Sequence, residues 1–244
     1  MKIVAIIPAR GGSRSIPMKN LKLLCGKPLI AWSILSAKES KLIDRVIVST
    51  DSAEIAEVAK KYGAEVPFLR PQELATDTLG IEPVLKHAYE WLKENENYNA
   101  DALVLLMPTS PTRQTFHIDD AIKIFQDTKA DSVVAVNETP ANHTPFWTLT
   151  RQKDGRVTLF GDIPLKKILT RRQDFPQKCY ARNDLVYVLK PENLYDKEKS
   201  NLYGEKVELY IISDPSRYEM DINTPDEWLY AERRFQKLID SFKK

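Results

Sequence analysis

Two short runs of wholly apolar residues constrain the fold of this chain more than any other feature. Ile3–Ile7 contains only isoleucine, valine and one alanine, and Ala102–Met107 is equally free of polar side chains. Strands that are apolar on both faces are typical of a parallel sheet covered by helices on both sides. Strand and helix patterns alternate from residue 3 to residue 136, as in βαβ units with right-handed crossovers. We therefore predict a single Rossmann-like, three-layer α/β domain over residues 1–244, with a mixed, mostly parallel sheet.

Local signals place the remaining elements of this domain. Asp51 is expected to cap a helix, because Glu54 completes a capping-box pattern, and His117 and His143 are expected at the edges of loops. Further strands are expected at 45–50, 65–69, 132–136, 184–189 and 207–212. Helical spacing predicts two further buried faces, one formed by Val84, Leu85, Ala88 and Leu92 and the other by Ile118, Ala121, Ile122 and Phe125. The last helix is expected to open with a capping box at Thr224–Glu227. Its buried face is expected to contain Trp228, Ala231, Phe235, Leu238 and Phe242.

The alternation breaks at residues 138–182, which contain four prolines and no long helical pattern. An Asp154-Gly155 turn between two apolar segments predicts a β-hairpin there. We interpret this stretch as an arm inserted in the domain, with exposed aromatic side chains. Such an arm is expected to form a homodimer contact; the alternative is a hairpin that folds back on its own domain.

Composition excludes several classes of protein. The chain of 244 residues has a net charge of +2, which gives no reason to expect binding to nucleic acid or to a membrane surface. Its two cysteines, Cys25 and Cys179, are too few for a disulfide framework or a zinc site. No apolar run approaches the roughly 20 residues needed to span a bilayer, and the first residues lack the layout of a signal peptide. A cytoplasmic enzyme is expected.

A cationic, glycine-containing loop follows the first apolar run and is the strongest functional signal. After Pro8 come Arg10, Gly11-Gly12, Ser13 and Arg14, and then Lys19. Glycines let the backbone turn sharply so that several N–H groups converge on an anion, and fixed cations beside them favour a polyphosphate. The pattern matches neither G-x-x-x-x-G-K-[ST] nor G-x-G-x-x-G. A solvated surface turn is the alternative to the triphosphate cradle that we predict.

Several blocks of sequence carry a family resemblance. They are Ile7–Arg14 and Ile16–Asn20, Ser49-Thr50-Asp51, Arg70-Pro71 with Leu74–Asp77, Pro108–Pro111, and Asp221–Thr224. In this order and spacing they resemble the CMP-sialic acid synthetases (acylneuraminate cytidylyltransferases), over nearly the whole chain. The resemblance implies a fold of the nucleotide-diphospho-sugar transferase type. It also implies transfer of CMP from CTP to a 3-deoxy-2-keto sugar acid, such as a sialic, legionaminic or pseudaminic acid, with release of pyrophosphate.

The same resemblance implies roles for individual residues. It places Arg10, Lys19 and Asp221 at the reaction centre, and Met107, Ser110 and Arg172 against the sugar acid. A Mg²⁺ cofactor is expected at Asp221 and Asn223, because hard oxygen ligands suit that ion. An arm that contacts a partner subunit of a homodimer is also implied. The nucleotide is expected to contact Arg10, Gly11, Gly12, Ser13, Lys19, Asn20, Arg70 and Asp77.

Three positions depart from the family pattern. Met107 stands where a glutamine commonly contacts the sugar, Trp147 falls near a position held by lysine in some relatives, and Asn223 replaces one aspartate of an Asp-x-Asp metal pair. Because a site that hydrogen-bonds a hydroxyl discriminates strongly, we expect a pocket suited to a more apolar acid of the legionaminate or pseudaminate kind. Two alternatives are a sugar nucleotidyltransferase with another nucleotide or a Kdo-like acid, and a nucleotide-binding homologue without turnover. The product is expected to serve lipopolysaccharide or capsule synthesis.

Overall fold

The computed structural model describes residues 1–196 and 201–241, and it divides the chain into two compact units. Unit 1 comprises residues 1–135 and 183–244, and unit 2 comprises residues 136–182. Each unit is described by itself below. The expected buried position of Phe242 lies outside the described residues.

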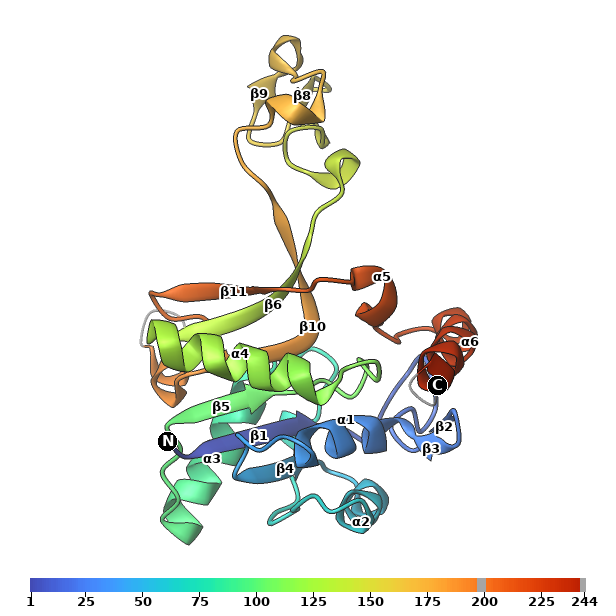
Figure 1. Ribbon diagram of the computed structural model, residues 1–244, viewed down its shortest axis with the longest axis vertical. Coiled ribbons are helices and arrows are strands. Elements are labelled where there is room, and N and C mark those ends of the chain that lie inside the picture. Colours follow the sequence, from blue (N-terminus) through green and yellow to red (C-terminus); the bar gives the residue numbers. More distant parts are fainter. Residues whose placement is uncertain (197–200, 242–244) are drawn as a thin grey trace. The chain divides into compact units, whose positions relative to one another are not determined.

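Unit 1 is built on one mixed sheet (Figure 1). Its strands β1 and β4 are parallel, β1 and β5 are parallel, and β10 runs antiparallel to β5. The strand order is β11-β6-β10-β5-β1-β4. The strands span Ile3–Pro8 (β1), Arg45–Ser49 (β4), Ala102–Leu105 (β5), Ser132–Glu138 (β6), Tyr180–Leu189 (β10) and Val207–Ile211 (β11). The predicted fold class is confirmed.

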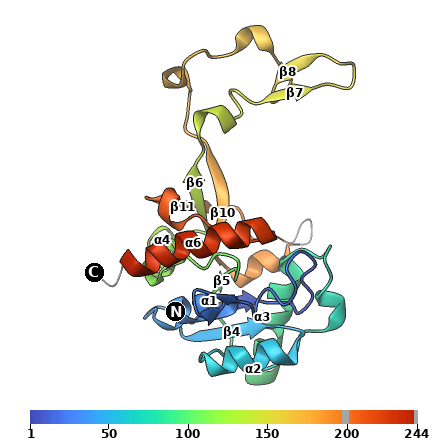
Figure 2. The ribbon, with the colours of Figure 1, turned by 90° about the vertical axis from the view of Figure 1, so that its right-hand side faces the viewer.

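Helices cover both faces of this sheet. Figures 1 and 2 show α1 and α4 on one face and α3 on the other, and an edge-to-face contact of Trp32 with Phe235, at 4.8 Å between ring centres, joins α6 to α1. The α-helices are α1 (Leu29–Lys38), α2 (Ala53–Lys61), α3 (Glu82–Glu96), α4 (Thr115–Thr128), α5 (Pro215–Tyr218) and α6 (Pro225–Ser241). Short elements of unit 1 are the strands β2 (Leu23–Leu24) and β3 (Lys27–Pro28) and the 3₁₀ turns η1 (Gln72–Leu74) and η5 (Pro191–Tyr195). In the described part of the chain, no helix combines the length and the apolar character that crossing a membrane requires.

The two apolar runs form the centre of the core, as their composition predicts. All six residues of β1 and all four of β5 are buried. Each fully buried isoleucine or valine stabilises the fold by about 1.5–3 kcal/mol relative to an exposed one. The helical spacing is confirmed as well, because the predicted faces of α3, α4 and α6 are the buried ones.

Three local predictions are wrong. Ser52, not Asp51, caps α2, since its hydroxyl oxygen accepts the N–H of Ile55. Residues 65–69 form no strand beyond a single bridge between Ile47 and Glu65, in keeping with the proline at position 67. His117 lies inside α4 and is 1% exposed; its Nδ1 accepts the N–H of Gln114 in a capping box.

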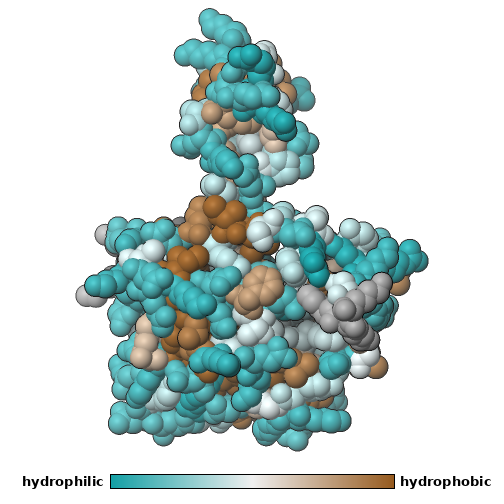
Figure 3. All heavy atoms as spheres, viewed as in Figure 1, coloured by the Kyte–Doolittle hydropathy of each residue, from teal (hydrophilic) through white to brown (hydrophobic). Residues whose placement is uncertain are grey.

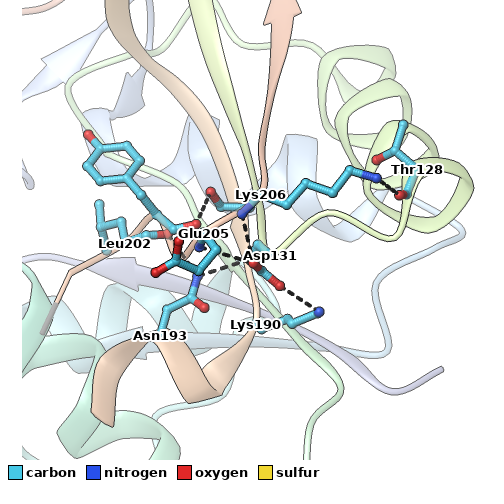
Figure 4. Close-up of polar contacts among 9 residues, drawn as sticks. Thr128, Asp131, Lys190, Asn193, Leu202, Glu205 and Lys206 are labelled. Carbon is cyan, nitrogen blue, oxygen red and sulfur yellow. Dashed lines mark hydrogen bonds and ion pairs between the residues drawn. The ribbon is translucent and has the colours of Figure 1, made fainter. Parts of the chain in front are cut away.

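Asp131 fastens the edge strand β11 to its neighbours (Figure 4). Its carboxylate accepts the backbone N–H groups of Glu205 and Lys206, at 3.1 and 2.8 Å, and pairs with the Lys190 ammonium at 2.7 Å. The Asn193 amide donates to the Asp131 carbonyl at 3.0 Å. The bond from Lys190 lowers the pKa of Asp131. This network fixes the turn that brings the chain back to the sheet.

Unit 2 contains the predicted hairpin. Strands β7 (Leu149–Arg151) and β8 (Val157–Leu159) pair antiparallel, β9 (Ile163–Pro164) extends them, and Gly155 has φ +86° in the turn. Three 3₁₀ turns complete the unit: η2 (Ala141–His143), η3 (Leu165–Lys167) and η4 (Arg172–Asp174). Figure 3 shows apolar side chains among hydrophilic ones on the visible face of this unit. Its exposed apolar residues are Leu149, Val157, Phe160, Ile163, Leu165 and Ile168.

The aromatic side chains of unit 2 are only partly as predicted. Phe146 and Trp147 pack against Phe175, at 4.9 and 5.0 Å between ring centres, and Trp147 donates its indole N–H to the Leu169 carbonyl. Phe160 remains 57% exposed. The apolar surface of unit 2 is therefore mostly aliphatic, with Phe160 as its aromatic member.

Candidate functional site

The loop after β1 is held in place by three hydrogen bonds. Ala9 donates its N–H to the Ser49 carbonyl at 2.9 Å, the Asn20 amide donates to the Arg10 carbonyl at 3.0 Å, and the Gly11 N–H donates to Oδ1 of Asp51 at 2.9 Å. These contacts join the carboxyl ends of β1 and β4, which are neighbours in the sheet. Ligands of open α/β sheets bind at this kind of edge.

The close approach of the loop to residues 51 and 52 favours glycine at position 11. A Cβ there would lie 3.1 Å from Cβ of Ser52, tighter than side chains normally pack. Because the Gly11 N–H is used by Asp51, that amide has no proton left for a phosphate. A phosphate at the Gly11 amide would have to displace Asp51, and the phosphate contacts of Gly11, Gly12 and Ser13 stay predictions.

Asp77 balances two cations of the loop. Its carboxylate forms ion pairs with Arg10 and with Arg14. The Arg10 side chain is 35% exposed and that of Asp77 26%, so solvent screens these pairs and they contribute little to stability. An anion that binds Arg10 must compete with Asp77 for the guanidinium.

Arg70 is the buried cation of the site. Its side chain is 4% exposed and one terminal nitrogen lies 3.7 Å from Oδ1 of Asp51. Burial lowers the pKa of Arg70, and the charge of Asp51 opposes that shift. Two buried guanidinium nitrogens, Nε and one terminal nitrogen, have no hydrogen-bond partner in the described part of the chain. Buried donors of this kind are rare in proteins and mark a place where a ligand can bind.

Lys19 contacts the turn that precedes α6. Its ammonium donates to the Ile222 carbonyl at 2.8 Å and lies 3.5 Å from Oδ1 of Asn223. Burial lowers the pKa of Lys19, and the charge of Asp221 opposes that shift. The turn is held by hydrogen bonds, since Glu227 accepts the N–H groups of Asn223 and Thr224 at 2.7 and 2.9 Å in the predicted capping box. Lys19 and Asp221 thus lie close together, as the motif predicts.

The donor set at 221–223 fits Mg²⁺ only in part. Asp221 offers an exposed carboxylate and Asn223 a neutral amide oxygen, and the Asn223 amide nitrogen donates to Oδ2 of Asp221 at 2.5 Å. In residues 1–196 and 201–241, no three His, Cys, Asp or Glu side chains group as metal ligands. Mg²⁺ commonly binds through one or two carboxylates plus substrate phosphates and water. The residues present suit such an ion once phosphates complete its ligand set.

Arg10, Arg70 and Asp77 line one cavity of about 240 Å³, together with Met107. The rest of its lining comes from the β1 end and the 74–84 segment: Pro8, Leu74, Thr76, Leu79, Gly80, Ile81 and Val84. Ligand pockets usually measure about 300–1,000 Å³, so this cavity has room for only part of a ligand of nucleotide size. Met107 gives the cavity an apolar wall where a glutamine would offer an amide.

Arg113 holds the segment that follows β5 through buried hydrogen bonds. It is 2% exposed, and its guanidinium donates to the Met107 carbonyl at 2.7 Å, to the Ser33 hydroxyl at 2.8 Å and to the Leu185 carbonyl. Burial lowers its pKa to about 9. Ser110 is 1% exposed and its hydroxyl donates to the Asp184 carbonyl at 3.1 Å. That hydroxyl is engaged inside unit 1, and a sugar contact from Ser110 stays a prediction.

Arg172 belongs to unit 2, whereas the residues described above belong to unit 1. It is exposed, begins η4 and lines a cavity of about 660 Å³ with Glu138, Thr144, Phe175, Lys178 and Cys179. Its neighbour Arg171 pairs with Asp174 at 2.8 Å and Lys178 pairs with Glu138 at 2.8 Å. Arg172 is therefore the cation of this cavity without a carboxylate partner among the described residues.

Sequence reasoning missed two residues of this site. Asp51 was expected only to cap a helix, although it follows β4 directly; parallel neighbouring strands end at the same edge of a sheet, which was the available signal. Arg113 has no motif of its own, and an arginine that bonds to backbone carbonyls leaves no pattern in the sequence. Arg14 was noted as a cation of the loop and is placed by its pair with Asp77.

Comparison with known proteins connects this geometry to a family. Residues 4–221 match the cytidylyltransferase family. A CMP-N,N'-diacetyllegionaminic acid synthase of Legionella pneumophila is 35% identical over 237 residues, which cover 96% of each chain. An N-acylneuraminate cytidylyltransferase of Escherichia coli O18:K1:H7 is 42% identical over 221 residues, 90% of this chain and 49% of that protein.

A solved structure supports the fold independently. The structure of CMP:2-keto-3-deoxy-manno-octonic acid synthetase complexed with CTP superposes with a TM-score of 0.69 over 97% of this chain and 99% of the other, at 15% identity. The chain therefore belongs to the cytidylyltransferase family, in agreement with its resemblance to the CMP-sialic acid synthetases.

Proposed function

We propose that this protein transfers a cytidylyl group from CTP to the anomeric hydroxyl of a nonulosonic acid. One observation carries the proposal: the cations Arg10, Lys19 and Arg70 gather with Asp221 in unit 1 of a cytidylyltransferase, next to a loop that follows a central strand. Such an arrangement suits a polyphosphate, because fixed cations attract its charges and buried donors remain to bind it.

The reaction forms a bond between the sugar oxygen and the α-phosphorus of CTP. The bond from that phosphorus to the bridging oxygen breaks, pyrophosphate leaves with the electron pair, and the hydroxyl proton passes to water. Negative charge spreads over the phosphoryl oxygens in the transition state, so positioning and charge neutralisation dominate catalysis. Arg10 and Lys19 would neutralise this charge, and Gly12 and Ser13 would bind phosphate oxygens. Asn20 would hold the loop through the hydrogen bond from its amide to the Arg10 carbonyl.

Asp221 and Asn223 would hold a Mg²⁺ ion together with the phosphates. When bound, the ion supplies positive charge to oxygens that become more negative in the reaction. Lys19 touches the same turn and would place its ammonium on the phosphates beside that position.

The acid is proposed to be of the legionaminate class. Met107 lines the cavity beside Arg10 and Arg70, and an apolar side chain favours a sugar with fewer hydroxyl groups to bind there. The Legionella relative that matches over 96% of both chains is a synthase for a legionaminic acid, whereas the E. coli relative acts on an N-acylneuraminate. Arg172 would bind the carboxylate of the acid through two parallel hydrogen bonds, as guanidinium groups commonly do.

A homodimer formed through unit 2 is part of the proposal. Six large apolar side chains of this unit are exposed, among them Leu149, Phe160 and Ile163. Exposed apolar patches of this kind mark protein interaction sites, and closed two-fold dimers are the commonest assembly. A cytoplasmic location and a role in lipopolysaccharide or capsule synthesis accompany the proposal as expectations.

Pyrophosphate release tests the proposal directly. Each of the four nucleoside triphosphates is combined with a panel of acids: N-acetylneuraminate, a legionaminate, a pseudaminate and an eight-carbon 3-deoxy-2-keto acid. We expect release with CTP alone and the highest kcat/KM with the legionaminate or the pseudaminate. A preference for another nucleotide would contradict the nucleotide assignment, and a preference for N-acetylneuraminate would contradict the role of Met107. CTP binding without any turnover would identify a non-catalytic homologue.

A further inference from the structure

Asp51 joins the phosphate loop to the end of β4. Its Oδ1 accepts the N–H of Gly11 at 2.9 Å, and its side chain is 11% exposed. The residue that caps α2 is its neighbour Ser52. The Asp51 carboxylate therefore does not cap α2. It binds the loop that follows β1 instead.

The same oxygen faces the buried cation of the site. A terminal nitrogen of Arg70 lies 3.7 Å from Oδ1 of Asp51, and the Arg70 N–H donates to the Thr50 carbonyl at 2.7 Å. At 3.7 Å the contact is a charge interaction rather than a hydrogen bond. Asp51 therefore compensates the charge of Arg70 through this terminal nitrogen, while Nε of Arg70 is left without a hydrogen-bond partner in the described part of the chain.

The two carboxylates near the loop differ in burial. Asp77 is 26% exposed and pairs with Arg10 and Arg14, so a phosphate can displace it. Asp51 is more buried, and its partners are a backbone amide and a buried guanidinium. Loss of its charge would leave the buried Arg70 guanidinium uncompensated, with Arg10 as a second positive charge that acts on it.

We propose that Asp51 is a positioning residue for nucleotide binding, which holds the phosphate loop through Gly11 and keeps Arg70 in place for the nucleotide. This inference rests on the proposed function, because it assumes that CTP binds between the loop and Arg70. Asp51 itself touches neither the sugar nor the reacting phosphorus. Substitution of Asp51 should therefore weaken the affinity for CTP and leave the KM for the acid unchanged.

Three variants separate the two contacts of Asp51 from the helix cap. Asp51→Asn keeps an oxygen that can accept the Gly11 N–H but removes the charge opposite Arg70. Asp51→Ala removes both. Ser52→Ala is the matched control: it deletes the hydroxyl that caps α2, which lowers stability, and leaves Asp51 in place.

The measurement is isothermal titration of CTP with Mg²⁺ in the absence of acid, with thermal melting and the KM for the acid recorded in parallel. We expect the Kd for CTP to rise about tenfold in Asp51→Asn and about a hundredfold in Asp51→Ala, as charge-assisted bonds are lost. Ser52→Ala should bind CTP as the wild type does, at a lower melting temperature. The KM for the acid should stay unchanged in Asp51→Asn.

Each outcome decides something. If wild-type protein binds CTP and both Asp51 variants bind it within about twofold, the inference is wrong and the proposed function stands. If wild-type protein binds no CTP, the proposed function and the inference both fail. Should Asp51→Ala not fold, Asp51→Asn carries the test alone, because it is isosteric and loses only the charge. A parallel rise in both the CTP and the acid constants would assign Asp51 a merely structural role.

Discussion

The two units of this protein use charge in different ways. In unit 1 the cations of the site are held by residues distant in sequence: Arg70 by Asp51, and Lys19 by the turn at 222–223. In unit 2 the ion pairs are largely local, as between Arg171 and Asp174. Unit 2 carries nine Lys and Arg against four Asp and Glu, whereas the rest of the chain carries 27 against 30. The cations of unit 1 are thus held by distant parts of the chain, whereas unit 2 presents a basic, partly apolar surface.

The largest expected effect is the loss of activity when the carboxylate of Asp221, in unit 1, is removed. Asp221→Ala should lower kcat/KM by about 10³-fold, because charge neutralisation at the transferring phosphoryl group is lost. Asp221 is exposed, so the fold should survive, as a melting curve will check. Asp226→Ala, an exposed carboxylate in the first turn of α6, is the matched control and should keep full activity.

A companion variant refines the same prediction. Asn223→Asp restores a second carboxylate beside Asp221, and the Mg²⁺ concentration at half-maximal rate should fall while turnover is retained. An active Asp221→Ala variant at ordinary Mg²⁺ concentrations would remove Asp221 from the reaction centre. Unchanged Mg²⁺ dependence in Asn223→Asp would place the ion elsewhere.

Disruption of the apolar surface of unit 2 should act on assembly rather than on the nucleotide. Phe160→Glu should raise the dimer dissociation constant by about 30-fold or more, since a charge replaces a buried apolar contact in both subunits. Leu229→Glu in α6 is the control, because Leu229 is 60% exposed and Phe160 57%. Sedimentation velocity measures the effect. A wild-type monomer, or equal dissociation in both variants, would contradict the proposed dimer surface.

The smallest expected effect concerns pH. Burial lowers the pKa of His117, in unit 1, from its ordinary value of 6.5 to about 3. Between these values the unfolded chain binds a proton that the folded chain excludes, so stability falls as pH drops below 6.5. At pH 5 the free energy of unfolding should be about 2 kcal/mol lower than at pH 7 through this group.

Urea unfolding at the two pH values checks this expectation. His117→Asn should reduce the pH dependence, although it also lowers stability at pH 7 through lost packing against Phe116 and Tyr218. His143→Asn, at an exposed histidine of unit 2, should leave the pH dependence unchanged. If His117→Asn and the wild type lose stability equally, His117 is not the titrating group.

Most of unit 1 was predictable from its sequence because its signals are local. Apolar runs, helical spacing and the Thr224–Glu227 capping box depend on neighbouring residues, and the structure confirms them. The errors have a common cause as well. Asp51 takes its role from Gly11, which lies 40 residues earlier in the chain, and His117 packs against Tyr218, about a hundred residues later. Two neighbouring residues that can both cap a helix, as at positions 51 and 52, cannot be told apart by pattern alone.

The candidate site was predictable only as a set of residue types. The motif names Arg10, Lys19 and Arg70, but burial of Arg70 and its unpaired donors depend on packing that a single sequence does not encode locally. The same holds for Arg113, whose partners come from α1 and β10. Roles for Arg172 and for Mg²⁺ rest on the resemblance and await experiment.

One titration addresses the central claim that Arg10 of unit 1 binds the nucleotide and Arg172 of unit 2 binds the acid. CTP with Mg²⁺ is titrated into Arg10→Ala and Arg172→Ala, and the KM for the preferred acid is measured for Arg172→Ala. We predict that Arg172→Ala binds CTP within about twofold of wild type while its KM for the acid rises at least about tenfold, and that Arg10→Ala loses about tenfold or more in CTP affinity. An Arg172→Ala protein that loses as much CTP affinity as Arg10→Ala would contradict this division.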